Sequence, residues 1–159
     1  MDNAGLSRQF SEVMFLIYSR VYRKIHPKAI EASRLAAPRL WKGETADRVL
    51  FARLWLADMS RLYGIPRVRF DFVDDPVLYE ESGGGRYILH EHRIVLYHRW
   101  SFVTLAHEFR HAVQASGFLE AMYLNDPEED ARAWSVSLFR LSCPKSYRSA
   151  VANGRLHFA

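Results

Sequence analysis

The chemical pattern that stands out in this chain is a pair of histidines four residues apart, with a glutamate directly after the first. His107, Glu108 and His111 form the sequence H-E-x-x-H. On an α-helix, residues four apart lie about 40° apart around the axis, so both imidazoles can bind one ion. Catalytic zinc sites use three protein ligands and a water. The spacing therefore predicts a single Zn²⁺ site, with Glu108 placed to take a proton from the water as general base.

The pattern is short enough to occur by chance, so its surroundings matter. Apolar residues stand on both sides of it, at 103, 105 and 106 before it and at 112 and 113 after it, and a strand over 94–97 is expected just before the helix. The alternative is two surface histidines on an amphipathic helix with a glutamate between them. Because the motif, its apolar frame and the preceding strand agree, we favour a metal site.

The third ligand is expected to be a carboxylate. His157 is the only histidine after His111, and it lies in a weakly patterned tail. The downstream acidic candidates are Glu120, Asp126, Glu128, Glu129 and Asp130.

The helix that starts in this acidic segment narrows the choice. Asp126 suits the N-cap, and Glu129 suits the third position of a capping box, which gives Glu129 a structural role. At 100° per residue, Glu129 falls nearly opposite the apolar stripe of the helix, whereas Glu128 and Asp130 border it. We predict Glu128 as the third ligand, with Glu129 as the second choice. Asp130 either orients a ligand histidine from behind or is a solvated carboxylate, and the whole cluster also suits a helix N-terminus. The stripe consists of Ala131, Trp134, Leu138 and Leu141.

Other polar and aromatic residues are given structural interpretations. A tight turn is expected around residues 90–92, between strands over 86–89 and 93–97. His90, His92 and His98 could form a second metal site near this turn, but surface histidines are favoured. Tyr123 could donate a hydrogen bond to a developing oxyanion, although a tyrosine that anchors a loop is favoured. The tryptophans are expected to be core or partly buried packing residues: Trp41, Trp55, Trp100 and Trp134.

Hydrophobic periodicity predicts the elements that position these residues. Helices are expected over 6–26, between Pro27 and Pro38, and over 45–63, 101–115 and 127–141. Strands are expected over 67–72, 86–89 and 93–97, residues 74–76 as a turn, and 145–159 as a weakly patterned ending. This order predicts an α+β fold: N-terminal helices, a small mixed or antiparallel sheet, the H-E-x-x-H helix, and a helix that carries the third ligand.

Composition limits the class of protein. The 159 residues suit one domain, which we divide into a helical N-terminal extension over 1–44 and a catalytic core over 45–142. A hydrophobic fraction of 49% excludes disorder of the whole chain, and the net charge of +4 gives only weak support for a nucleic-acid partner. Cys143 is the single cysteine, so neither an intramolecular disulfide nor a cysteine zinc cluster is expected. With no signal peptide or membrane span recognised, a cytoplasmic location is expected.

The motif segments resemble minimal zincin metallopeptidases of the SprT-like and ImmA/IrrE-like kinds. The resemblance covers about residues 45–141 and rests on 85–87, 93–96, 104–112 and 128–135. In the ImmA/IrrE group, the first glutamate of an E-x-x-A-x-x-F-A segment is the third zinc ligand, which implies Glu128. The resemblance thus implies a zincin-like, gluzincin-like fold and a protein or peptide substrate.

Three functional hypotheses follow. The first is a zinc metallopeptidase with ligands His107, His111 and Glu128 and with Glu108 as general base. The second is a non-catalytic, zinc-stabilised binding or regulatory module, which could associate with nucleic acid. The third is a helical nucleic-acid binder without a metal. An unliganded Glu108 favours the first, because a purely structural zinc site has no use for a base there.

Overall fold

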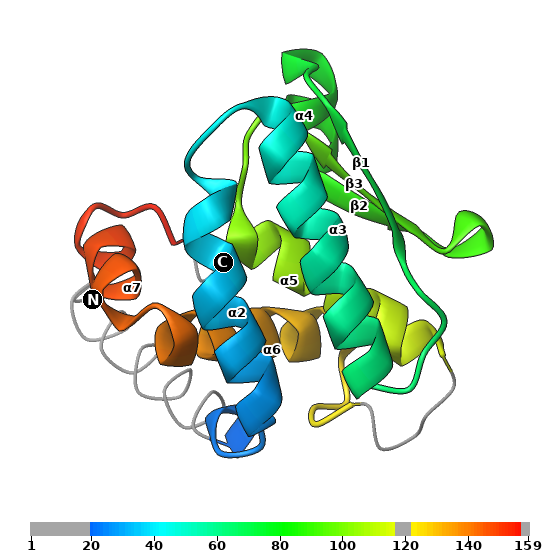
Figure 1. Ribbon diagram of the computed structural model, residues 1–159. Helices are drawn as coiled ribbons and strands as arrows, with labels where there is room; N and C mark the ends of the chain where they lie inside the picture. The colour runs from blue at the N-terminus through cyan, green and yellow to red at the C-terminus, as the bar shows by residue number, and fades with distance from the viewer. Residues whose placement is uncertain (1–19, 117–121, 157–159) are drawn as a thin grey trace, which may run out of the picture.

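Two long helices open the part of the chain that is described. The computed structural model describes residues 20–116 and 122–156, so most of the helix predicted over 6–26 lies outside it. Residues 20–22 are helical and the chain then turns. Helix α2 spans Pro27–Leu40 and helix α3 spans Thr45–Leu62. They pack against each other, and α2 also packs against the later helix α6 (Pro127–Ser142), as Figure 1 shows.

The prediction that Pro38 ends the second helix is wrong, because α2 continues through it to Leu40. Proline removes one backbone hydrogen bond and is costly in a helix interior. Here it lies in the last turn, and Leu40 beyond it is fully buried. The apolar burial of Leu40 favours completing the turn. The predicted end of α3 is confirmed: Tyr63 is the C-cap, and Gly64 follows with φ 64°.

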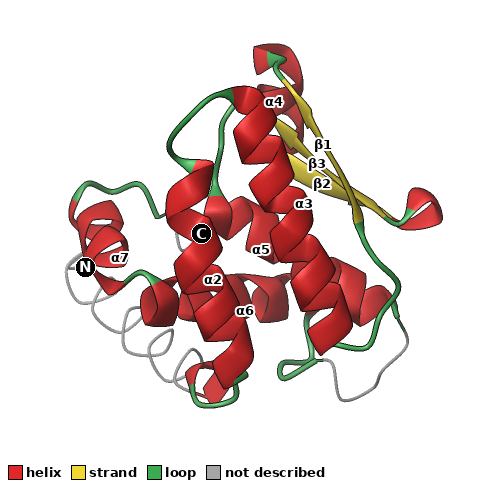
Figure 2. Ribbon diagram, viewed as in Figure 1, coloured by secondary structure: helices red, strands yellow, loops and turns green. Residues whose placement is uncertain are grey.

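A three-stranded mixed sheet lies beside the helices (Figure 2). Its strands are β1 (Arg69–Val73), β2 (Gly85–Ile88) and β3 (Arg93–Tyr97), in the order β1-β3-β2. Strand β3 pairs parallel with β1 and antiparallel with β2. All three strands were predicted, and the mixed pairing agrees with the predicted α+β class. Because β3 is central, four of its five residues are buried.

The interpretation of residues 74–76 as a turn alone is wrong. A short helix, α4, spans Pro76–Ser82 and ends at Gly83, whose φ is 69°. The Asp75 carboxylate accepts hydrogen bonds from the backbone N–H of Val77 and Leu78, which would otherwise lack partners. An N-cap aspartate followed by proline is thus the signal of a helix start at this point.

The two helices of the predicted site begin where the sequence places them. Helix α5 spans Phe102–Ala115, and the Ser101 hydroxyl accepts from Thr104 N at 3.1 Å. At the start of α6, the Asp126 carboxylate accepts from Glu129 N at 2.8 Å. These contacts satisfy N–H groups that the first turn of a helix leaves free. They fix the rotational position from which each helix presents its side chains.

The C-terminal region holds a helix that periodicity did not predict. Helix α7 spans Pro144–Ala152 and packs against α6. None of its residues is fully buried, which explains its weak pattern. Its Tyr147 ring meets Phe139 of α6 edge-on.

Aromatic rings join α3, α5 and α6. Trp55 meets Phe102 and Phe109 edge-on, at ring-centroid distances of 5.4 and 5.5 Å. Tyr63 meets Phe109 and Trp134 in the same way. Edge-to-face pairs contribute beyond their area burial, so this cluster fixes α5 against its neighbours. The buried positions of Trp55 and Trp134 confirm the expectation for those two residues. No helix in the described parts is long and apolar enough to cross a membrane.

Candidate metal centre

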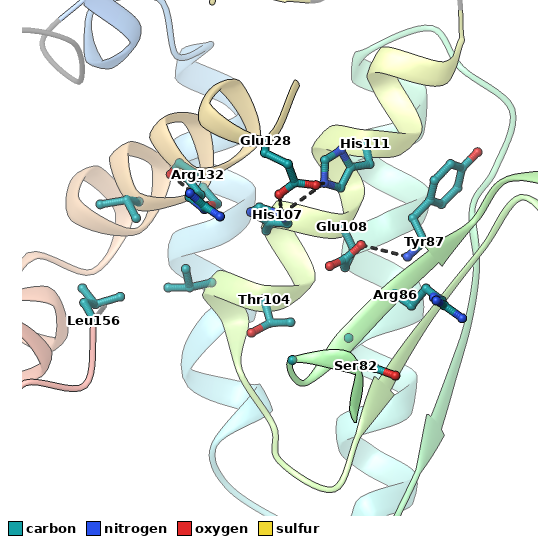
Figure 3. A pocket seen from close by; sticks show the side chains of 15 residues that line it. Ser82, Arg86, Tyr87, Thr104, His107, Glu108, His111, Glu128, Arg132 and Leu156 are labelled. Atoms are coloured by element: carbon teal, nitrogen blue, oxygen red, sulfur yellow. Dashed lines mark hydrogen bonds and ion pairs between the residues drawn. The ribbon is translucent and has the colours of Figure 1, made fainter. Parts of the chain in front are cut away.

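One face of α5 lines a pocket of about 670 Å³ between α5, β2 and α6 (Figure 3). Thr104, His107, Glu108 and His111 lie on this face at steps of three, one and three residues. The opposite face of the helix is buried in the aromatic core. The amphipathic pattern of α5 therefore determines which side chains reach the pocket.

Three side chains converge at this face. The Nε2 atoms of His107 and His111 lie 3.1 Å apart. One oxygen of Glu128 lies 3.2 Å from His107 Nε2, and the other lies 3.1 Å from His111 Nε2. Donor atoms about 2.0–2.1 Å from a shared tetrahedral ion are about 3.3 Å apart, as simple geometry requires. The three separations match that spacing, so these residues could hold a zinc ion.

The hydrogen bonds of Gln114 define which His111 nitrogen is free. Both N–H groups of the Gln114 amide are used, by Pro127 O and by Asp130 Oδ2, each at 2.9 Å. Its oxygen therefore accepts from His111 Nδ1–H, at 2.8 Å. In the neutral imidazole this leaves a lone pair on Nε2. That lone pair faces a Glu128 oxygen at 3.1 Å. Two hydrogen-bond acceptors this close repel each other, but a cation between them would bind to both.

Asp130 supports this arrangement from behind. Its carboxylate is fully buried and accepts hydrogen bonds from the Arg110 guanidinium, from the Gln114 amide and from backbone N–H groups of residues 123 and 124. The expectation of a solvated carboxylate is therefore wrong, because Arg110 and these donors replace water. Asp130 reaches His111 through Gln114 and so belongs to the outer shell of the candidate site.

Glu128, in the first turn of α6, contacts both imidazoles although its side chain is 57% exposed, whereas the acidic residues at 126, 129 and 130 do not contact them. Glu129 is exposed at the third position of the helix, and its backbone N–H, rather than its side chain, makes the capping contact with Asp126. Asp126 serves as the N-cap. Glu120 and His157 lie outside the described residues.

Glu108 is held by the sheet. Its Oε2 accepts from Tyr87 N at 2.8 Å, which leaves Oε1 free for another proton donor. Burial raises the pKa of Glu108 above its ordinary value, because a buried carboxylate is harder to charge. The close approach of β2 requires Gly85: a Cβ there would lie 2.7 Å from Thr104 Cγ2 and 3.4 Å from Glu108 Cγ.

The electrostatics also keep His107 neutral. Burial, followed by the adjacent His111, lowers the pKa of His107 to about 4. A neutral imidazole offers a lone pair, which is the form that binds a metal. At neutral pH, His107 is thus already in the neutral form that can bind a metal, and no proton has to be released first.

The histidines near the hairpin do not form a second group. His92 is bonded to Tyr87 Oη and Pro66 O, each at 2.8 Å, whereas His98 contacts Asp74. His90 is exposed beside Glu91. Within residues 20–116 and 122–156, the only metal-competent group found is His107, His111 and Glu128.

Tyr123 lies away from the pocket. Its hydroxyl donates to Lys24 O at 3.4 Å, and the Arg110 guanidinium lies over its ring. This agrees with the role of a loop anchor. Gln114, Tyr87 and Arg132 were not predicted as site residues. Gln114 follows His111 by three residues and Arg132 follows Glu128 by four, so helical spacing could have indicated both.

Comparisons of the chain with protein-family models, with curated proteins and with solved structures gave no match.

Proposed function

We propose that this chain is a zinc-dependent metallopeptidase with a zincin-like, gluzincin-like architecture. His107, His111 and Glu128 would hold the ion, and Glu108 would be the general base. The observation that carries the proposal is the convergence of two imidazole Nε2 atoms and one carboxylate at 3.1–3.2 Å. When bound, zinc would supply Lewis acidity, which acidifies water and polarises a carbonyl group.

The residues of the chain divide the remaining work. Glu108 Oε2 is occupied by Tyr87 N–H, so Oε1 is the atom that would accept the proton from the attacking water. A raised pKa makes Glu108 a better base than an exposed glutamate. The same carboxyl group can then return the proton to the leaving amine. Gln114 keeps the His111 ring oriented throughout.

The shape of the site supports a peptide substrate. Strand β2 lies at the edge of the sheet and contributes residues 85–87 to the pocket. An edge strand carries backbone groups that can bind an extended chain by β-augmentation. The pocket is therefore suited to a segment of protein or peptide that passes the metal ligands.

The test separates metal binding from catalysis. Glu108→Gln should retain about one zinc per chain while abolishing cleavage of a peptide library, as followed by mass spectrometry. Glu129→Gln is the matched control, because Glu129 is exposed on α6, and this variant should cleave like the wild type. Glu128→Gln should weaken zinc binding itself, by about tenfold or more, since a neutral amide oxygen is a poorer ligand.

The outcomes distinguish the hypotheses. Cleavage that persists in Glu108→Gln would contradict the proposed base. Bound zinc without cleavage by the wild type would favour the non-catalytic binding module. Failure of the wild-type protein to take up zinc on titration would refute the metal centre.

A further inference from the structure

A cationic side chain stands beside the candidate ligands on the α6 side of the pocket. Arg132 follows Glu128 by one helical turn, and it extends toward His107 in Figure 3. Both side chains line the same pocket, so the guanidinium borders the space next to the proposed ligands.

The charge of Arg132 has no counterion in the described structure. At a spacing of four residues, a glutamate and an arginine on a helix commonly pair. Here the Glu128 carboxylate instead contacts the two imidazoles. No ion pair or cation–π contact of Arg132 is found among residues 20–116 and 122–156, whereas the buried Arg110 has both kinds. The five N–H donors of Arg132 are thus available to a ligand.

The charge balance of a zinc-loaded site also favours an anionic ligand at Arg132, and this step rests on the proposed function. The two charges of a zinc ion would be balanced by the carboxylates of Glu128 and Glu108. Two arginines of the pocket, Arg86 and Arg132, then remain as excess positive charge, and Arg132 is the one that extends toward the proposed ligands. Apolar residues of the same pocket, Val103, Val136 and Leu156, line this side. Arg132 is exposed at this open pocket, so its guanidinium can be reached by a ligand.

We propose that Arg132 is a specificity residue that binds a carboxylate of the substrate next to the scissile bond. The planar guanidinium matches a carboxylate in a bidentate geometry. The carboxylate has two sources in a peptide: an aspartate or glutamate side chain, or the free C-terminus. The pocket would therefore prefer an acidic segment or a chain end over a neutral internal one.

The experiment measures binding separately from turnover. Zinc-loaded Glu108→Gln protein is titrated with pairs of fluorescent peptides. In some pairs the two peptides differ by glutamate or glutamine at one position, and in another pair the C-terminus is either free or amidated. We expect one carboxylate-bearing peptide to bind about tenfold tighter or more than its neutral partner. Adding Arg132→Gln should remove this difference, and Arg132→Lys should retain part of it. The side-chain and C-terminal peptides identify the source.

Arg86 supplies the matched control. It is an arginine of the same pocket, but it lies on β2 and points away from the imidazoles in Figure 3. The Arg86→Gln change should leave the carboxylate preference in place. An equal loss of preference in Arg86→Gln and Arg132→Gln would refute a specific contact, because it would reflect the general charge of the pocket.

Turnover by otherwise wild-type protein gives the second readout. Arg132→Gln should raise KM for the carboxylate-bearing peptide and leave kcat and the neutral peptide nearly unchanged. An equal fall of kcat on both peptides would overturn the inference and assign Arg132 to oxyanion stabilisation instead. Peptide cleavage without any carboxylate preference would refute this inference but not the proposed function. Carboxylate-selective binding without cleavage would support Arg132 and refute the peptidase.

Discussion

Asp130 is the residue whose substitution tests most directly how the candidate site is built. Its carboxylate accepts from Arg110 Nε at 2.8 Å, Gln114 Nε2 at 2.9 Å, and the backbone N–H groups of Tyr123 at 2.7 Å and Leu124 at 3.2 Å. The Arg110 side chain is only 1% exposed and that of Asp130 is fully buried. Asp130→Asn keeps the shape of the side chain but removes the charge.

The expected loss of stability follows from the buried charge that remains. Removing one partner of a buried ion pair costs about 3–5 kcal/mol, because the other charge stays uncompensated. That is a large part of the roughly 5–15 kcal/mol that a domain has in total. At about 2–4 °C per kcal/mol for a chain of this size, the melting temperature should fall by about 6–20 °C. Calorimetry of metal-free protein measures this fall without a contribution from zinc.

The same substitution should weaken zinc binding. The Gln114 amide loses its charged acceptor and holds His111 less firmly. Outer-shell substitutions typically cost about 10- to 100-fold in metal affinity, and we expect the lower end, because Gln114 keeps its bond to Pro127 O. Competition against a chelating dye measures this affinity. The measurement should be made at a temperature where the variant is folded.

The control and the refutation use neighbouring residues. Asp126→Asn is the same chemical change at an exposed N-cap, where asparagine is equally suitable, and it should alter stability by less than about 0.5 kcal/mol. Combining Asp130→Asn with Arg110→Met removes the buried cation and should recover about 2 kcal/mol or more. A loss below about 1 kcal/mol for Asp130→Asn, or simple additivity in the double variant, would refute the reasoning.

Three further predictions concern packing and protonation. Gly85→Ala places a Cβ 2.7 Å from Thr104 Cγ2; thermal unfolding should show a loss of about 1–3 kcal/mol, and an unchanged melting temperature would contradict the contact. Burial, with Tyr123, raises the pKa of Tyr63 from 10 to about 12. The native state therefore retains this proton more tightly than the unfolded state, and stability should fall between pH 10 and 12 and fall less in Tyr63→Phe, as urea titrations would show. Burial raises the pKa of the Cys143 thiol, so a disulfide reagent at pH 8 should react slowly with native protein and quickly in urea; equal rates would refute this.

The sequence predicted best what depends on local spacing. His107, Glu108 and His111 lie on one helix, so their common direction follows from helical geometry alone. The prediction of Glu128 needed one further argument, the direction of the apolar stripe of α6. In the structure, the Glu128 carboxylate contacts both imidazoles. The elements that were missed, α4 and α7, bury no residue completely. Hydrophobic periodicity therefore had little signal there.

What could not be predicted depends on contacts between elements distant in sequence. Tyr87 N–H meets Glu108 across 21 residues, and it does so because Gly85 allows β2 to approach α5. The Arg110–Asp130 pair spans 20 residues in the same way. Each of these residues also has an ordinary role as a surface or strand residue. Whether such a residue belongs to the site can be decided only when the packing of its helix or strand against the neighbouring element is known.

The first turn of α6 shows how one acidic cluster serves folding and the proposed chemistry together. Successive residues of a helix are turned by 100°, so the four carboxylates cannot share one environment. Asp126 caps the helix, Glu128 faces the imidazoles, Glu129 faces solvent, and Asp130 enters the core. Because Asp130 fastens the turn that carries Glu128 to α5, the proposed ligands are held together before an ion binds. If the site binds zinc as proposed, little of the binding energy would be needed to order it, and that energy would remain for affinity and for polarising a substrate.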